Sequence, residues 1–431
     1  METKNRWKSR FRNPVSAFYA ISAVGILSFF LISLRYGSAA YTWVIQENNP
    51  NIRFSDYFWH LAQTVDRSHL YQNISWDAAG CFPPLAYCMY YLLYKFTRPL
   101  DMIPRDLAQT EQIPGAMLIF IYYLLFSSLL LLAAISITGR KSRKRDAVIF
   151  SLLMFSAVFF GSAIPSGNSA VLVLSLLLTA LHLKDTESAW KRELGLILLA
   201  VCVALKLYPA VFGLLYLKEK RYRELLRLMV CSAALLFLPF VFFGGYPGFR
   251  HWLLHIMNTM GYSDLYRLQY FRGIFHTILF RFLGRERPLV TMALTLGAAG
   301  VLAWNAWRSR NLYRTLFFLI TIMCFFPANV YRYTLCYFSI PLIMGLKESG
   351  EKRRGWCSWP VMTLYGLLFT IPSWWLLVIP MEKRYPYETL TGVELYLYLI
   401  VYALIGVVLV IEWADRLIRT REAHKPWIFA L

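Results

Sequence analysis

Long apolar runs recur along this chain, and they constrain its fold more than any other feature of the sequence. A run of about 20 apolar residues is long enough to cross the hydrocarbon core of a bilayer as a helix. Hydrophobic residues make up 58% of the 431 residues and charged residues only 16%, against about a quarter charged in soluble domains. We therefore predict an all-α polytopic membrane protein, with residues 1–431 forming a single integral membrane domain.

The N-terminus joins a basic flank to the first apolar run. The flank reads METKNRWKSRFRNP, and the run extends from Val15 to Leu34. This run is too long for the core of a signal peptide and has no clear small-residue cleavage site. We predict a retained anchor whose basic flank lies in the cytoplasm.

Short basic loops between apolar runs account for most of the net charge of +21. The positive-inside rule places such loops in the cytoplasm, so the charge does not require a nucleic-acid partner. The basic segments are 1–12, 139–145, 184–193, 218–227, 307–311, 347–355 and the tail after Glu412. Placing them all on one side predicts about twelve membrane segments with both termini cytoplasmic. The seven cysteines include no CxxC pair and indicate neither a disulfide framework nor a metal site.

Two segments must leave and return to the same side under this arrangement. The first is a hairpin that turns at residues 164–168. The second, residues 193–217, is predicted to be a pair of short helices broken near Lys206, because Gly and Pro interruptions at membrane depth occur where the backbone faces a cavity or protein.

Two large loops then lie outside. The apolar run 84–97 is short for a crossing, and a crossing there would move the basic segment 139–145 to the wrong side. We therefore predict that 36–113 is a first extracytoplasmic loop with juxtamembrane helices, with 84–97 lying on or dipping into the outer leaflet. Residues 244–287 form the second.

The first outer loop carries the most informative carboxylate, Asp56. It follows Ser55 at the start of a predicted helix whose apolar positions share one face, which is typical of an amphipathic helix at a membrane surface. A carboxylate at a helix start often only caps free backbone amides. Capping and catalysis are both open for Asp56, whereas Asp66 and Asp77 are interpreted as solvated loop residues.

Five short motifs in this chain resemble, in order, those of the polyprenyl-phosphate-dependent GT-C glycosyltransferases. The resemblance is strongest to family 87, which includes polyprenyl-phosphate-mannose-dependent α-mannosyltransferases, and it covers roughly residues 15–230. The motifs are Asp56-Tyr57-Phe58, His69-Leu70-Tyr71, Phe82-Pro83-Pro84-Leu85, Gly167-Asn168-Ser169 and Ala204-Leu205-Lys206-Leu207-Tyr208-Pro209.

The resemblance implies that Asp56 is the catalytic base of a hexosyltransferase with a GT-C type bundle. The donor would carry its own leaving group, so the enzyme would deprotonate the acceptor hydroxyl and stabilise charge on the departing phosphate. Displacement with a single base implies inversion at the anomeric carbon. Tyr57, His69 and Tyr71 are candidates for substrate contact, the tyrosines by stacking on sugar rings.

Cationic residues are the candidates for binding the carrier phosphate. Lys206 interrupts an apolar run, where an ionisable group is costly; phosphate contact and snorkelling to the surface are the alternatives. Arg332 stands where the family commonly has His, and it can bind phosphate bidentately or meet lipid headgroups. Arg267 and Arg272 in the second outer loop are further candidates.

No metal or cofactor is predicted, and the metal requirement is open. His251 and His255 have the four-residue spacing of helical metal ligands, but ordinary interfacial histidines are favoured because no third ligand motif is near.

The predicted function is transfer of mannose or a similar sugar from a polyprenyl-phosphate donor to a lipid-linked glycan or cell-envelope polysaccharide. The reaction would take place on the outer face of the cell membrane, among membrane lipids. The alternatives are a transporter or flippase of lipid-linked sugars, which would favour inverted repeats, and an inactive scaffold of the same fold.

Overall fold

The structure is a computed structural model whose described residues form helices joined by turns. It describes residues 13–37, 40, 44, 54–64, 67–72, 80–96, 114–139, 142–261, 269–285, 287–327, 331–348, 356–373 and 392–423. Every regular element among these residues is helical, which confirms the predicted all-α class.

The helices follow one another along the chain with short 3-10 or π-helical turns, labelled η, between some of them. They are α2 (Val15–Tyr36), α4 (Ser55–Gln63), α5 (Pro84–Phe96), α7 (Pro114–Ile137), α8 (Arg143–Met154), η2 (Phe159–Ala163), α9 (Ala170–Leu183), α10 (Ala189–Leu205), η3 (Tyr208–Phe212), α11 (Gly213–Lys218), α12 (Tyr222–Phe237), η4 (Leu238–Phe242), α13 (Gly245–Gly261), α14 (Phe271–Leu283), α15 (Pro288–Arg308), α16 (Leu312–Phe325), η5 (Arg332–Phe338), α17 (Ser339–Lys347), α19 (Trp359–Leu368) and α21 (Gly392–Ala423).

Five helical segments within the described residues are long and apolar enough to cross a membrane. They are Val15–Tyr36, Gly115–Ile137, Tyr222–Phe242, Pro288–Arg308 and Val393–Arg419. Three shorter apolar helices, α9, α16 and α19, pack among them. These helices indicate a multi-pass membrane protein, while the count of about twelve membrane segments stays a prediction.

The predicted interruption near Lys206 is confirmed. Helix α10 ends at Leu205, the Lys206 backbone is extended with φ −148° and ψ 118°, and η3 begins at Tyr208. Pro209 contributes to this break because proline has no amide hydrogen for a helical hydrogen bond. The predicted turn at residues 164–168 is also present, between η2 and α9.

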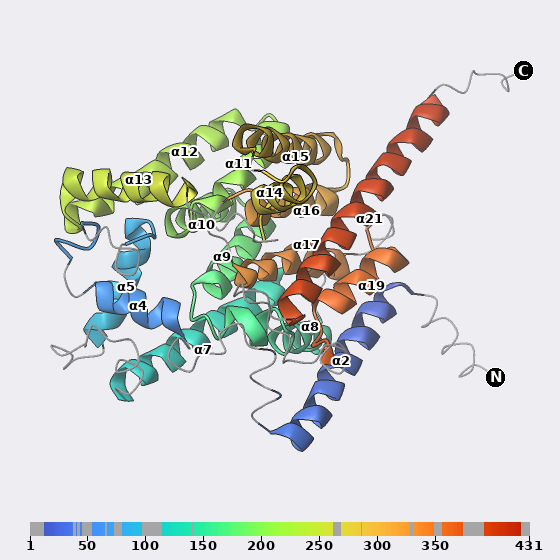
Figure 1. The fold of residues 1–431 in the computed structure, drawn as a ribbon, viewed down its shortest axis with the longest axis horizontal. Helices are drawn as coiled ribbons and strands as arrows, with labels where there is room; N and C mark the ends of the chain where they lie inside the picture. The colour runs from blue at the N-terminus through green and yellow to red at the C-terminus, as the bar shows by residue number, and fades with distance from the viewer. Residues whose placement is uncertain are drawn as a thin grey trace, which may run out of the picture.

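Three of the helices of the predicted outer loops lie toward one end of the molecule, whereas α14 lies beside α15. Figure 1 shows α4, α5 and α13 on the left of the view, whereas the start of α2 and the end of α21 lie on the right. The predicted amphipathic face of α4 packs on protein, since Phe58 and Leu61 are fully buried in an aromatic cluster with α5 and α7. It is therefore not a free face for the membrane surface.

Residues in or next to the basic segments that the sequence places on one side contact one another in the fold. Lys347 forms a buried ion pair with Asp146 at 2.8 Å, and Lys184 pairs with Glu219 at 2.7 Å. Arg314 pairs with Glu412 at 3.1 Å. We refer to these three pairs together as the paired charges.

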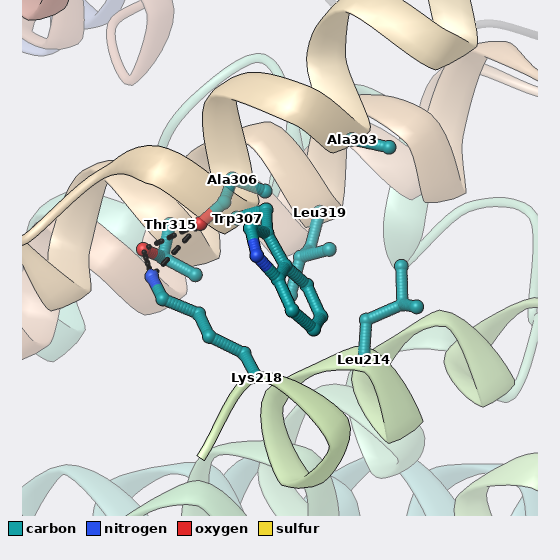
Figure 2. A pocket seen from close by; sticks show the side chains of 7 residues that line it. All are labelled: Leu214, Lys218, Ala303, Ala306, Trp307, Thr315 and Leu319. Carbon is teal, nitrogen blue, oxygen red and sulfur yellow. Dashed lines mark hydrogen bonds between the residues drawn. The ribbon is translucent and has the colours of Figure 1, made fainter. Parts of the chain in front are cut away.

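Lys218 joins a further pair of basic segments, beside an apolar pocket (Figure 2). Its ammonium donates to the carbonyl oxygens of Ala306 and Ser309 and to Thr315 Oγ1, at 2.7–2.8 Å. An ammonium has three donors, so Lys218 is saturated. It stabilises the carboxyl end of α15 and has no proton left for an anion in the pocket.

Candidate active site

The start of helix α4 is held by the turn that precedes α9. The backbone amides of Phe54 and Asp56 donate to the carbonyl oxygens of Pro165 at 2.8 Å and Ser166 at 3.1 Å. Gly167 has φ +66°, and a Cβ added there would lie 2.8 Å from Tyr57 Cβ. Only glycine permits this close approach, so two motifs 110 residues apart form one backbone unit.

The Asp56 carboxylate is bonded across this junction. Its Oδ2 accepts a hydrogen bond from Asn168 Nδ2 at 2.6 Å. The N-cap position of α4 is Phe54, which makes no side-chain capping bond. The Asp56 side chain thus bonds the neighbouring segment, and its catalytic role stays a prediction.

Burial sets the protonation of Asp56. Desolvation raises the pKa of this carboxyl above its ordinary value, although the Asn168 hydrogen bond and the positive charge of Lys206 both act to lower it. The side chain remains partly exposed. A partly exposed carboxyl with a raised pKa is suited to accept a proton from a bound hydroxyl.

Lys206 lies at the break between α10 and η3, and its charge acts on the Asp56 carboxyl. Its Nζ is 3.6 Å from the centroid of the Phe82 ring and 5.6 Å from that of Tyr333. The side chain is only 4% exposed. Within the described part of the chain, it forms neither an ion pair nor a side-chain hydrogen bond, which leaves its charge without a bonded anion.

The segment around Phe82 is positioned by the other predicted motifs. The Tyr71 hydroxyl donates to the Phe82 carbonyl oxygen at 2.9 Å, and Pro84 begins α5. Gly80 packs so closely on Leu70 and Tyr71 that a Cβ there would lie 2.6 Å from Leu70. The aromatic ring beneath Lys206 is therefore fixed by residues 70–71 and by the prolines.

A network that sequence reasoning missed lies beside these residues. His60 Nδ1 is 3.0 Å from the Tyr87 hydroxyl, which also contacts Gln63 Oε1 at 3.0 Å and the Cys81 backbone amide at 3.1 Å. The His60 ring also stacks on Phe82 with centroids 3.9 Å apart. The sequence spacing could have identified His60, because it follows Asp56 by four residues and shares its helix face.

The other predicted contact residues of the first outer loop differ in their burial. Tyr57 is fully buried among Phe58, Tyr90, Phe120 and Tyr123, and Tyr71 is 3% exposed. Both have packing roles in the structure, and their stacking on a sugar stays a prediction. His69 is exposed, with Nδ1 3.1 Å from Ser68 Oγ.

The arginines are spread over several elements. Arg332 is fully buried and donates to the carbonyl oxygens of Val44 and Gly161, so one of its amino groups is committed to the backbone. Arg272 lies partly buried in the first turn of α14, which packs mainly on α15. Arg267 lies outside the described residues.

The described residues contain no group of three His, Cys, Asp or Glu side chains placed to hold a metal ion. His251 and His255 both lie on α13, and the metal requirement remains open.

Comparison with known proteins identifies the family. The model of glycosyltransferase family 87 matches residues 104–329, a range that includes Asn168 and Lys206 but neither Asp56 nor Phe82. The comparisons with curated proteins and with solved structures returned no match. Because the family model covers more than half of the 431 residues, the chain belongs to glycosyltransferase family 87, a family of GT-C type.

Proposed function

We propose that this glycosyltransferase is an inverting enzyme that takes a hexose such as mannose from a polyprenyl-phosphate donor. Its acceptor would be a lipid-linked glycan or cell-envelope polysaccharide. The observation that carries the proposal is that the Phe82 ring contacts both Lys206 and His60, which lies one helical turn from Asp56. Asp56 can take a proton and Lys206 can bind an anion.

Asp56 is the proposed base. Its carboxylate takes the proton of the acceptor hydroxyl as that oxygen attacks the anomeric carbon of the donor sugar. The bond between the anomeric carbon and the carrier phosphate oxygen breaks, and the bonding electrons leave with the phosphate. A single displacement of this kind inverts the configuration of the sugar, whereas retention would require a second, nucleophilic carboxylate.

Lys206 is the proposed partner of the departing phosphate. A buried cation is costly unless an anion or several hydrogen bonds compensate it, and among the described residues the main contacts of its ammonium are aromatic faces. Such contacts stabilise a cation by about 0.5–2 kcal/mol. A phosphate would compensate the charge fully, and its charge grows as the donor bond breaks, which makes the interaction strongest in the transition state.

The remaining predicted cations supplement this site in the proposal. Arg272, Arg267 and His69 would contact the carrier headgroup or neighbouring lipid phosphates. Arg332, the first residue of η5, whose guanidinium also bonds backbone carbonyls, would supply positive charge.

The proposal places the site on the outer face of the cell membrane and both termini in the cytoplasm. Two features support it. Residues in or next to the basic segments that the positive-inside rule assigns to the cytoplasm contact one another, and α4 and α5 lie at the opposite end of the molecule from the end of α21 (Figure 1).

The test is carrier-phosphate release by the purified protein. It is incubated in detergent or liposomes with a panel of short-chain polyprenyl-phosphate sugars, with and without a glycolipid acceptor. We expect one sugar of the panel to be transferred, with inversion and with stoichiometric release of polyprenyl phosphate. Transfer from a nucleotide sugar instead, or movement of intact donor across the liposome without release, would contradict the proposal, the second outcome in favour of a flippase.

A further inference from the structure

His60 presents an unused ring nitrogen beside the proposed base. Residues four apart on a helix share a face, so His60 and Asp56 point to the same side of α4. The imidazole is 5% exposed and stacks on Phe82, the ring that also contacts Lys206. It is thus placed where the donor sugar, attached to the phosphate at Lys206, would lie.

The network around Tyr87 determines which ring nitrogen carries the proton. A tyrosine hydroxyl has one proton to donate and two lone pairs to accept. The Cys81 amide donates to it, and Gln63 Oε1, an acceptor, takes its proton. With the Gln63 amide oriented in this way, His60 Nδ1, 3.0 Å from the same oxygen, is assigned as a donor.

A neutral imidazole has a single N–H, so Nε2 keeps its lone pair. The ring is neutral, because desolvation and the nearby charge of Lys206 lower the pKa of His60 to about 3. Within the described residues, Nε2 has no hydrogen-bond partner, since both polar contacts of the ring involve Nδ1.

A lone pair in this position discriminates among the parts of the substrate. Phosphate oxygens are acceptors and would repel it, whereas a sugar hydroxyl can donate to it. We propose that His60 Nε2 accepts a hydrogen bond from a hydroxyl of the donor sugar and so contributes to sugar selection. The inference rests on the proposed function, because it takes the sugar to lie between Asp56 and Lys206.

The test is a set of double-mutant cycles between the protein and the donor. His60→Asn keeps an amide donor at the place of Nδ1 and removes Nε2, while His60→Gln supplies an amide oxygen near the place of Nε2. Each variant is assayed with polyprenyl-phosphate mannose and its 2-, 3-, 4- and 6-deoxy and deoxyfluoro analogues. Thermal unfolding in detergent reports whether each variant is folded.

We expect His60→Asn and one deoxy analogue each to lower kcat/KM by about tenfold, the effect of one neutral hydrogen bond. Combined, they should lower it no further than either does alone. The deoxyfluoro analogue at that position should behave like the deoxy one, because fluorine cannot donate, and His60→Gln should recover part of the loss.

Three outcomes would count against the inference. If the losses in kcat/KM caused by His60→Asn and by the deoxy analogue multiply at every sugar position, His60 does not contact the sugar. A His60→Gln variant no more active than His60→Asn would also contradict the proposed hydrogen bond. A deoxyfluoro donor that restores activity would show that His60 donates instead of accepting. Absence of phosphate release by the wild-type protein would overturn the proposed function itself, which is a distinct result.

Discussion

Lys206 and Lys347 are both almost fully buried, at 4% and 1% exposure, but their surroundings differ. Lys347 pairs with Asp146 at 2.8 Å and also donates to the Ile135 carbonyl oxygen. Lys206 contacts two aromatic faces and, among the described residues, no ion-pair partner. One belongs to the paired charges, the other to the Asp56 site.

The difference teaches how to separate structural from functional charge in this protein. A buried ion compensated by its own chain stabilises the packing that places it there. A buried ion without a bonded counterion destabilises the folded state, and such charges cluster at functional sites. The same substitution in the two regions should therefore have opposite consequences.

The largest effect is expected for Asp56→Asn. The amide preserves shape but cannot take a proton, so transfer should fall by about 10²–10⁴, the usual contribution of a general base. The measurement is phosphate release under saturating donor. Asp185→Asn is the matched control, because Asp185 is 54% exposed in a surface ion pair and exposed pairs contribute little; wild-type turnover by Asp56→Asn would remove the assignment.

Substitution of the two lysines by methionine tests the comparison directly. Lys347→Met leaves Asp146 buried without its cation and should destabilise the fold by about 3–5 kcal/mol. Lys206→Met removes an uncompensated charge, so the melting temperature should stay or rise while transfer falls by about 10²–10³. Thermal unfolding and kcat/KM on both variants check this. Equal loss of stability in both would show that Lys206 has an internal partner.

A smaller effect is expected at the turn that carries Asp56. Gly167→Ala places a Cβ 2.8 Å from Tyr57 Cβ, so α4 must shift, and a displacement of about 1 Å at a site can lower the rate about 100-fold. Gly284→Ala is the control, since its φ of +65° matches the +66° of Gly167 but no atom lies within 4 Å of the added Cβ. Equal activities of the two variants would contradict the close junction.

The smallest effect is a shift in the pH profile. A base acts when deprotonated, so the transfer rate should rise with pH through the raised pKa of Asp56, above the range of an ordinary aspartate. Asn168→Ala and Lys206→Met each remove an influence that lowers this pKa, so residual activity should require higher pH in both, more so for Asn168→Ala. If the acidic side of the pH–rate profile does not shift in either variant, a group other than Asp56 controls it.

Much of the fold could be predicted because apolar runs and breaks are local signals. The run from Val15 to Leu34 lies within α2, and Pro209 and Lys206 mark the break after α10. The amphipathic pattern of α4 predicted a helix at the membrane surface, and that location stays a prediction, but the partner of its apolar face is decided by nonlocal packing. Periodicity shows that Phe58 and Leu61 share a face, but only packing shows that α5 and α7 cover it.

For the candidate site, too, the sequence predicted the residues and the structure showed their arrangement. The sequence by itself determined a helical membrane protein and, through motifs in order, singled out Asp56, Asn168 and Lys206. Only the tertiary structure decided that Asn168 bonds Asp56, that Tyr71 supports Phe82, and that His60 lies between Phe82 and Tyr87. Motif order records residue identity along the chain, whereas the hydrogen bonds of the site join residues 11, 27 and 112 positions apart in sequence, which come within a few ångströms only in the folded chain.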